Sequence, residues 1–470
     1  KLDFITKGLS FKIKGSYNTS YWTQKVASSS VATYTPVIQE DGSIAYRKNG
    51  SDSQLSYSRN TNGEGKSRDW YMEVALNYNR KFGDHNVTGL LLYNQSKRYY
   101  PGGTYDDIPS AYVGFVGRVT YDWKTRYMAE FNAGYNGSEN FAPGKRYGFF
   151  PAGSVGWIVS EESFFKPLKK VVSYLKLRAS VGMVGNDNNG NNRFLYLPDA
   201  YVLGGDGYYC GTNAGSAQPG AYEATKSNAD VTWEKAVKQN YGIDFTIFNE
   251  RLGVSVDWFK ENRRDILTTP DYMPGILGMT LPIMNVGKTE NKGIEVTLNT
   301  IWFQNKNFSW NTDWTYSLNR EKIKALNSGV TRDEGNLWFV GSPTQVFYDY
   351  KKIGIWQLGE EVQAKAFGGF KPGDIKVADM SPKGSEGEGV FSTDDRVIFS
   401  RVPKYTFGIT NNIIYKNFDL MFFIYGRIGQ YVKDAYTQLY KPSALENSAP
   451  VNYWTPENPS NEYPRPNSGY

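Results

Sequence analysis

The sequence predicts an all-β fold, an antiparallel transmembrane β-barrel with long extracellular loops. Residues 233–318 contain four segments in which apolar and polar residues alternate, as in strands with one apolar and one wet face. Short polar turns and long loops also alternate along the chain, which places all long loops on one side of a membrane. Aromatic residues make up 16% of the chain, although its mean hydropathy is only −0.55. Aromatic girdles around a polar interior explain that combination.

Composition excludes several other classes of protein. The 470 residues are too many for one ordinary globular core, so length alone would suggest several domains. No apolar run reaches the roughly 18–20 residues of a membrane-spanning helix, which excludes a helical membrane protein. The net charge of +6 comes from 53 basic and 47 acidic residues without a Lys/Arg block, so nucleic acid is not an expected partner.

Alternation predicts roughly 13–15 strands. In one of the best segments Tyr241, Ile243 and Phe245 share one face, and Gly242 and Asp244 take the other. The clear strands, in chain order, are residues 8–22, 69–81, 87–98, 113–123, 127–135, 147–159, 175–181, 241–247, 252–258, 294–302, 308–318, 405–415 and 418–425.

The connections between these strands fall into two sets. The short turns lie near residues 83, 124, 165, 250, 305 and 416. The long loops lie near residues 30–67, 99–110, 136–146, 185–230, 261–284, 320–404 and 430–470. A hairpin is expected within the first long loop, at 34–38 and 44–47, and a short helix at 161–172.

Six aliphatic residues are expected on the lipid-facing side of the wall. They are Leu76, Leu91, Val254, Val256, Val296 and Leu298. We expect residues 1–470 to be part of a barrel domain, an interior fragment of a longer protein. The chain opens on Lys1-Leu2-Asp3-Phe4, and its other end is a Pro/Asn-rich loop rather than a closing strand.

No catalytic set is evident, so an enzyme is not expected. The single Cys210 permits no intrachain disulfide, and the single His85 lies in a predicted turn. Nucleophile-elbow, HExxH and CxxC motifs are missing from the sequence.

A series of short motifs resembles the SusC/RagA family of TonB-dependent outer-membrane transporters from Bacteroidota. They occur in the family's order and span nearly the whole chain. The motifs are YGFFPAGSVGW at 147–157, LKLRASVG at 175–182 followed by Gly185-Asn186, WEK at 233–235, NVG at 285–287 with NKGIE at 291–295, PGDIK at 372–376, PKYTFG at 403–408 and WTPENP at 454–459.

This resemblance implies a barrel of ~22 strands, a size that carries a plugged lumen. It implies that a plug domain and a TonB-contacting segment lie outside this chain, as do the closing C-terminal strands. It also implies a SusD-like surface lipoprotein as a lid, and active import of oligosaccharides or oligopeptides powered through TonB. The expected location is the cell outer membrane, with lipid around the barrel.

The resemblance raises the question of a calcium site in the acidic run 374–395, where family members often carry a calcium-loop-like sequence. Asp374, Asp379, Asp394 and Asp395 are the candidate ligands. Met380, Pro382 and Lys383 interrupt the spacing of oxygen ligands, so a solvated acidic loop is the favoured alternative. Otherwise no cofactor is expected.

Aromatic residues in the long loops are candidates for cargo contact, because rings stack on sugar faces and pack on peptide side chains. The candidates are Tyr208, Tyr209, Trp338 and Phe339. The alternative is that they pack the loops against each other and the lid. Two other functions stay open at this stage: a siderophore-type TonB-dependent transporter without a lid, and a surface-displayed soluble glycan-binding β-protein.

Overall fold

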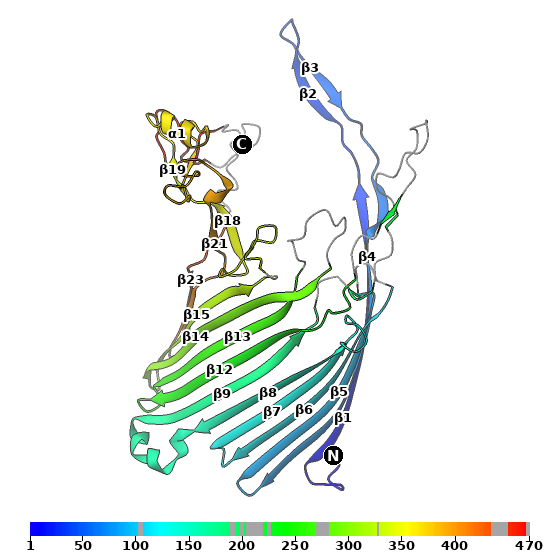
Figure 1. Cartoon of the computed structure of the whole chain (residues 1–470), viewed down its shortest axis with the longest axis vertical. Helices are drawn as coiled ribbons and strands as arrows, with labels where there is room; N and C mark the ends of the chain where they lie inside the picture. The colour runs from blue at the N-terminus through cyan, green and yellow to red at the C-terminus, as the bar shows by residue number, and fades with distance from the viewer. Residues whose placement is uncertain are drawn as a thin grey trace.

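One large antiparallel sheet dominates the computed structural model (Figure 1). The structure describes residues 1–101, 107–188, 193–197, 202–203, 220–222, 227–268, 282–326, 329–433 and 450–466. The sheet has 13 strands. They are β1 (Leu9–Ser28), β4 (Ser56–Phe82), β5 (His85–Tyr99), β6 (Ser110–Trp123), β7 (Tyr127–Ser138), β8 (Tyr147–Ile158), β9 (Val172–Asn186), β12 (Glu234–Ile247), β13 (Leu252–Thr268), β14 (Met284–Gln304), β15 (Phe308–Ala325), β22 (Tyr405–Tyr415) and β23 (Phe418–Ile428).

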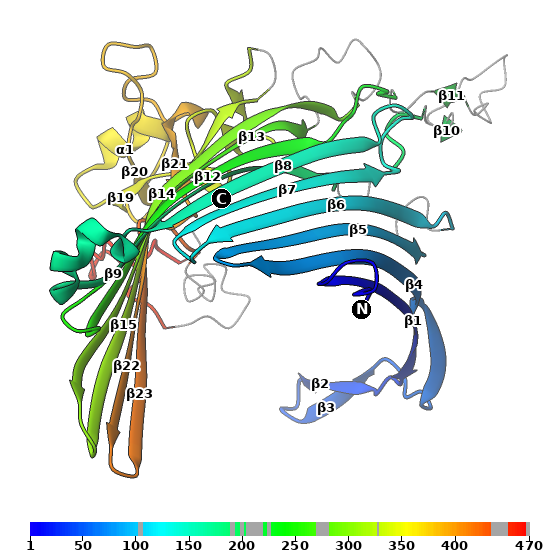
Figure 2. The same ribbon diagram turned by 90° about the horizontal axis from the view of Figure 1, so that it is seen from below.

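The spatial order of these strands follows the chain, and each pairs with the next one. Seen from below, the sheet curves into an arc from β1 round to β23 (Figure 2). These two strands are the edges of the sheet within the described residues. An up-and-down wall of tilted, curved antiparallel strands is the architecture predicted from the sequence.

The predicted separation of turns and loops is confirmed. The short turns lie along the lower edge in Figure 1, and the long connections lie along the upper edge. The turn after Trp123 uses the left-handed backbone region, with φ of 54° at Lys124 and 55° at Thr125. Two successive positive φ values suit a tight hairpin turn. The predicted helix between β8 and β9 is present as two 3-10 helices, η1 (Val159–Glu161) and η2 (Ser163–Lys170).

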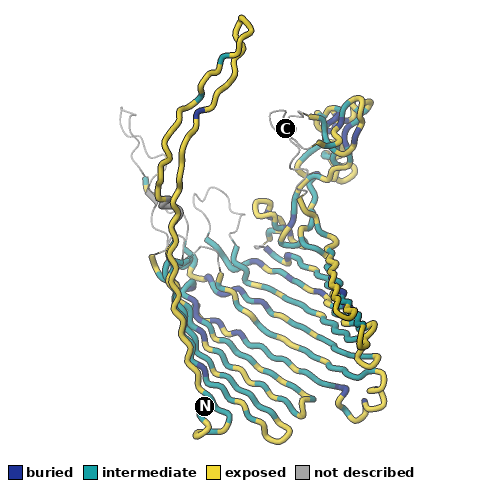
Figure 3. Tube along the Cα trace, turned by 180° about the vertical axis from the view of Figure 1, so that it is seen from behind, coloured by how far each residue is buried: buried dark blue, intermediate teal, exposed yellow. Residues whose placement is uncertain are grey.

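The first hairpin of the sheet is much longer than the alternation of apolar and polar residues predicted. β1 and β4 stay paired from Leu9↔Tyr78 up to Ser28↔Ser56, whereas β5 pairs with β4 only as far as Arg68↔Tyr99. The upper part is therefore a two-stranded ribbon that rises above the wall, and the β1 side chains along it are exposed (Figure 3). Its residues were predicted as loop because both faces meet water there, so no apolar alternation marks the strand.

Smaller strands and helices lie above the upper edge of the sheet. The predicted hairpin at the tip of the ribbon is confirmed as β2 (Thr33–Ile38) and β3 (Ile44–Asn49). The remaining elements are β10 (Val202–Leu203), β11 (Ala221–Tyr222), β16 (Arg332–Asp333), β17 (Trp338–Phe339), β18 (Val346–Tyr350), β19 (Lys352–Ile355), α1 (Glu361–Gly368), β20 (Ile375–Val377), η4 (Thr393–Asp395) and β21 (Arg396–Ser400). In the described part of the chain, no helix has the length and apolar character needed to cross a membrane.

The register gives the wall one apolar and one polar face. Cross-strand partners share a face, so Leu177, Ile243, Val256, Val296 and Tyr316 form one apolar row. All six predicted lipid-facing residues lie on this apolar face, with Leu76 opposite Leu91 and Val254 opposite Leu298. The opposite face is polar and lines the lumen.

An aromatic belt on the apolar face marks the lower membrane boundary. Near the short turns, Trp123 stacks on Tyr127 at 5.7 Å between ring centres, and Tyr127 stacks on Trp157 at 6.2 Å. His85 continues the row at 6.4 Å from Trp123. Amphipathic rings favour the interface between hydrocarbon and water.

A second aromatic belt lies higher on the same face. Tyr93 and Phe115 are 4.9 Å apart, and Tyr135 stacks on Tyr147 at 5.0 Å. The aliphatic outer row lies between the two belts. Their arrangement matches the apolar band and paired girdles of an outer-membrane barrel.

The assignment of faces predicts that Val254→Arg impairs barrel assembly. A charged side chain at mid-depth on the lipid face costs roughly 2–4 kcal/mol. We expect less heat-modifiable barrel in outer-membrane fractions, measured by gel electrophoresis with and without boiling. Thr297→Arg is the matched control, because Thr297 lies on the opposite face and pairs with Ser255. Equal abundance of both variants would refute the assignment of faces.

Candidate functional site

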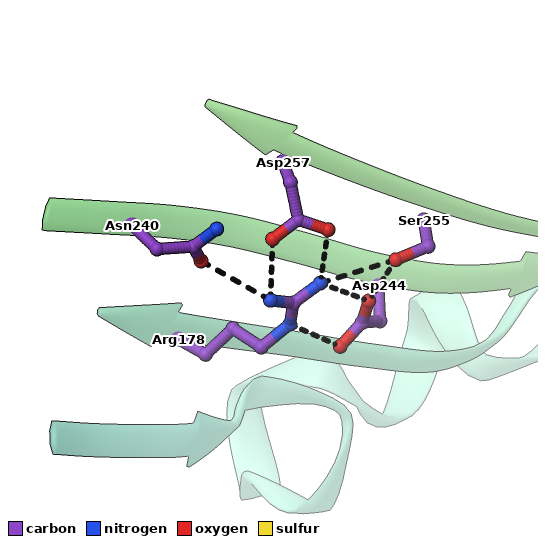
Figure 4. A network of polar contacts seen from close by, with 5 residues as sticks. All are labelled: Arg178, Asn240, Asp244, Ser255 and Asp257. Atoms are coloured by element: carbon purple, nitrogen blue, oxygen red, sulfur yellow. Dashed lines mark hydrogen bonds and ion pairs between the residues drawn. The ribbon is translucent and has the colours of Figure 1, made fainter. Parts of the chain in front are cut away.

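The luminal face of β9, β12 and β13 carries a network centred on Arg178 (Figure 4). The Arg178 guanidinium donates to Asp244 at 3.0 and 3.2 Å and to Asp257 at 2.5 and 2.6 Å. Asn240 accepts a further bond at 3.3 Å, and Ser255 accepts one at 3.1 Å while donating to Asp244. One cation thus binds two carboxylates, which are supplied by two neighbouring strands.

The strand register explains how the Arg178 guanidinium reaches Asp257, which lies two strands away. Arg178 pairs with Gly242 on β12, and Gly242 pairs with Asp257 on β13. A Cβ on Gly242 would lie 2.4 Å from the guanidinium carbon. The side chain therefore crosses β12 over a glycine, and any other residue there would block its path.

Further ion pairs continue along the luminal face. Arg118 pairs with Glu130 at 2.8 Å between β6 and β7. Lys238 pairs with Glu261 at 3.3 Å between β12 and β13. The luminal wall is thus a surface of paired charges and amides, which suits contact with water and polar solutes and gives no catalytic arrangement.

A hydrophobic cluster lies at the extracellular rim. Its buried members are Phe141, Phe150, Val231 and Trp233. Strands β8 and β9 pair only up to Ala152↔Gly182, and above that point the Phe150 ring lies where a Cβ on Gly185 would be, 2.0 Å from its ring carbon. Trp233 meets Phe150 edge-on at 5.2 Å.

Polar bonds complete this rim cluster. The Trp233 indole donates to the carbonyl of Arg146 at 3.0 Å. The buried Glu234 accepts from the backbone of Leu267 and from the side chain of Asn186, each at 2.9 Å. Strand β12 is thereby tied to the loop before β8 and to the upper ends of β9 and β13.

Asn285 connects strand β14 to the same cluster. Its side chain accepts from the backbone of Thr232 at 2.9 Å and donates to the carbonyls of Thr232 and Asp265 at 2.8 and 2.7 Å. Residues from four separate sequence motifs therefore meet at one place. The sequence showed the motifs but not their convergence, because strand order alone does not fix which loop ends touch.

A compact unit stands on the same edge, built from residues 329–404 and 450–466. Its core holds Trp356, Ala364 and Phe367. The second segment is bound to the first, since Trp454 donates to the side chain of Gln357 at 2.9 Å and Arg465 pairs with Asp374 at 3.0 Å. Two long connections that are distant in sequence thus fold together.

Two of the four candidate cargo residues can be placed. Trp338 and Phe339 form β17, whereas Tyr208 and Tyr209 lie outside the described residues. Phe339 is 5% exposed and packs on Tyr348 at 4.9 Å, with Arg332 over both rings. Trp338 is half-buried beside it. Contact of these residues with cargo stays a prediction.

Three of the four candidate calcium ligands have polar partners that the structure describes. Asp395 is fully buried and accepts from the backbone of Met380 and Ser392, both at 2.8 Å. Asp374 is bound by Arg465, and Asp394 is exposed within η4. Across the residues that can be described, no group of three or more His, Cys, Asp or Glu side chains is arranged to hold a metal ion.

Asp379 is held by backbone donors. It accepts from Gly389 at 2.7 Å and from Ser381 at 2.9 Å, and these bonds keep the pKa of its carboxyl below the usual value. The bonds close the loop 379–389 by themselves. A structural calcium ion there stays a prediction.

The polar lumen, the lipid-facing band and the segregated loops together define the wall of an outer-membrane β-barrel. Comparison with known proteins gives its family. The model of the TonB-dependent receptor-like β-barrel matches residues 2–455, and the chain belongs to that family. The family consists of transporters and receptors of the outer membrane, not enzymes, which rules out a soluble surface protein.

Individual relatives agree with the resemblance to SusC and RagA. TonB-dependent receptor P3 of Formosa agariphila is 30% identical over 84% of this chain, and the chain spans 42% of its length. TonB-dependent receptor SusC of Bacteroides thetaiotaomicron is 28% identical over 68% of this chain and 31% of its own. The RagAB peptide transporter shares the fold, with a TM-score of 0.71 and 20% identity over 99% of this chain and 51% of that one.

The Arg178 network predicts a specific stability pattern. We expect Arg178→Met to destabilise the barrel by about 1–3 kcal/mol, because two half-buried carboxylates would lose their counter-ion. Thermal loss of heat-modifiability measures the effect. The triple variant Arg178→Met, Asp244→Asn, Asp257→Asn should recover part of the loss. A triple variant less stable than the single one would contradict the charge argument.

The rim cluster predicts a local defect. Trp233→Ala removes a buried ring and should cost about 3–5 kcal/mol at the rim. Loops on either side should then be cut faster by protease added to intact cells, while the wall stays heat-modifiable. Trp302→Ala, which removes a ring near a lower turn, is the control. Unchanged cleavage in Trp233→Ala would show that the cluster does not anchor the loops.

Proposed function

We propose that the receptor containing this chain imports oligosaccharides or oligopeptides across the outer membrane. The luminal wall is the observation that carries the proposal. Its strands present apolar side chains to lipid and an Arg178-centred array of charges and amides to the interior. Such a surface suits the passage of large polar solutes, which bury little apolar area.

The names of relatives support the same class of cargo. One solved structure with this fold is called a peptide transporter, and one relative is SusC. We extend to this chain the power source and the architecture that the family implies. Energy would arrive through TonB, by way of a plug domain and a TonB-contacting segment carried outside these 470 residues.

A SusD-like surface lipoprotein is the proposed partner at the extracellular mouth. The features that favour it are the tall ribbon of β1 and β4 and the compact unit at 329–404, both of which rise above the wall (Figure 1). The ribbon exposes aromatic side chains such as Tyr34, Tyr46 and Tyr57. A siderophore-type transporter would work without this partner.

Uptake by intact cells tests the proposal. Cells carrying the complete receptor should take up fluorescent oligosaccharides or oligopeptides, and alanine at Tyr208, Tyr209, Trp338 and Phe339 should slow uptake roughly tenfold, the effect of losing about 1.4 kcal/mol of binding. The reason is the loss of stacking surface for cargo. Surface abundance, measured by antibody, must stay equal.

Phe4→Ala is the control, because Phe4 is 83% exposed near the lower edge of the sheet, away from the loops. Uptake of a ferric chelate with no uptake of either polymer would favour the siderophore-type alternative. Co-purification of a lipoprotein of the SusD kind from native membranes separates the two transporters independently of cargo.

A further inference from the structure

Three cations gather on the lipid-facing side of the wall, just above the upper aromatic belt. Lys66 and Arg68 belong to β4, and Lys97 belongs to β5. Arg68 pairs with Tyr99 in register, and Trp70 pairs with Lys97. Because Val74 and Leu76 share their face, these cations point outward and not into the lumen.

The depth of these cations follows from the strand geometry. From His85 in the lower belt to Lys97, strand β5 covers roughly 40 Å, which is about 30 Å along the membrane normal for a strand tilted by 35–45°. The apolar band of a barrel is about 25 Å tall. Lys97 and its neighbours therefore lie at the headgroup level of the leaflet that faces outward.

Tyrosine rings hold the three cations in place. The guanidinium carbon of Arg68 is 4.0 Å from the centre of the Tyr99 ring, and the Lys97 ammonium is 5.2 Å from the same centre. The Lys66 ammonium lies 4.0 Å from the centre of the Tyr100 ring. A cation over a ring face is attracted to it but keeps most of its hydrogen-bond donors free.

The ion pairs around these cations can be traced for the described side chains. Among the side chains that the structure describes, none forms an ion pair with Lys66, Arg68 or Lys97. Asp69, which follows Arg68, faces the lumen and pairs there with Arg98 at 3.6 Å. Elsewhere in the wall, Arg118, Arg178 and Lys260 are each paired.

We propose that Lys66, Arg68 and Lys97 bind the phosphate groups of a lipid in the outward-facing leaflet. Phosphate oxygens accept several charge-assisted hydrogen bonds, which guanidinium and ammonium groups donate. The acyl chains of that lipid would lie along the aliphatic band below, past Tyr93 and Leu91. The lipid site lies on the opposite face of the wall from the solute path, so it does not depend on the proposed cargo.

Native mass spectrometry of the complete receptor, delipidated in neutral detergent, tests the site. The probes are diphosphorylated lipid A, the same lipid after removal of its phosphates, and inorganic phosphate. We expect the triple variant Lys66→Gln, Arg68→Gln, Lys97→Gln to bind the phosphorylated lipid roughly tenfold or more weakly than the wild type. Removing the phosphates from the lipid should weaken wild-type binding to a similar extent.

Two further variants separate charge at this place from charge in general. Lys66→Arg, Arg68→Lys, Lys97→Arg keeps the charges and should bind like the wild type, which also excludes misfolding as the cause of lost binding. Lys365→Gln, Lys371→Gln, Lys383→Gln removes three exposed cations from the extracellular unit and should leave binding unchanged.

The proposal is overturned if the first variant binds the phosphorylated lipid as the wild type does, or if the control variant loses as much. It is also overturned if inorganic phosphate displaces the lipid at equal concentration, because the site would then recognise a free anion. Uptake of cargo is not part of this measurement, so a failure here leaves the proposed transport function untouched.

Discussion

The structure depends on one constraint: backbone N–H and C=O groups that face hydrocarbon must find partners within the protein. Antiparallel pairing between each strand and the next satisfies this requirement for the eleven inner strands of the sheet, and for one side of the edge strands β1 and β23. Because side chains alternate, the same pairing fixes which residues meet lipid and which meet the lumen. The outer aliphatic rows, the aromatic belts and the luminal charges all follow from that register.

This constraint on side chains applies only within the membrane, and the strands differ above it. Within the band, Leu91 and Val254 must be apolar, so the alternation is strong. Above the band, β1 and β4 continue as a ribbon whose faces both meet water, and β13 and β14 extend well past the predicted limits. Strand pairing continues there although apolar and polar residues no longer alternate. The backbone still gains hydrogen bonds from pairing, while the side chains are free to vary.

Charge is placed differently on the two faces. In the lumen, Arg178 binds two aspartates, and Lys238 pairs with Glu261. On the outer face, Lys66, Arg68 and Lys97 rest on tyrosine rings and keep their charge available. Pairing in the lumen keeps the wall stable in a partly desolvated space. Cations at headgroup level that have no ion pair among the described side chains fit the anionic surface of a bilayer.

The sequence by itself determined the class of fold, the thirteen clear strands, the side of the long loops and the lipid-facing residues. The reason is that a strand against lipid needs an apolar residue at every second position, and this alternation is visible in the sequence. It also marked Trp233, Glu234 and Asn285 through local motifs. Only the tertiary structure decided that these residues meet in one rim cluster, that residues 450–466 complete the unit at 329–404, and that Arg178 crosses Gly242 to reach Asp257. Such contacts join positions far apart in the chain, and their geometry depends on strand register and loop paths that no local pattern records.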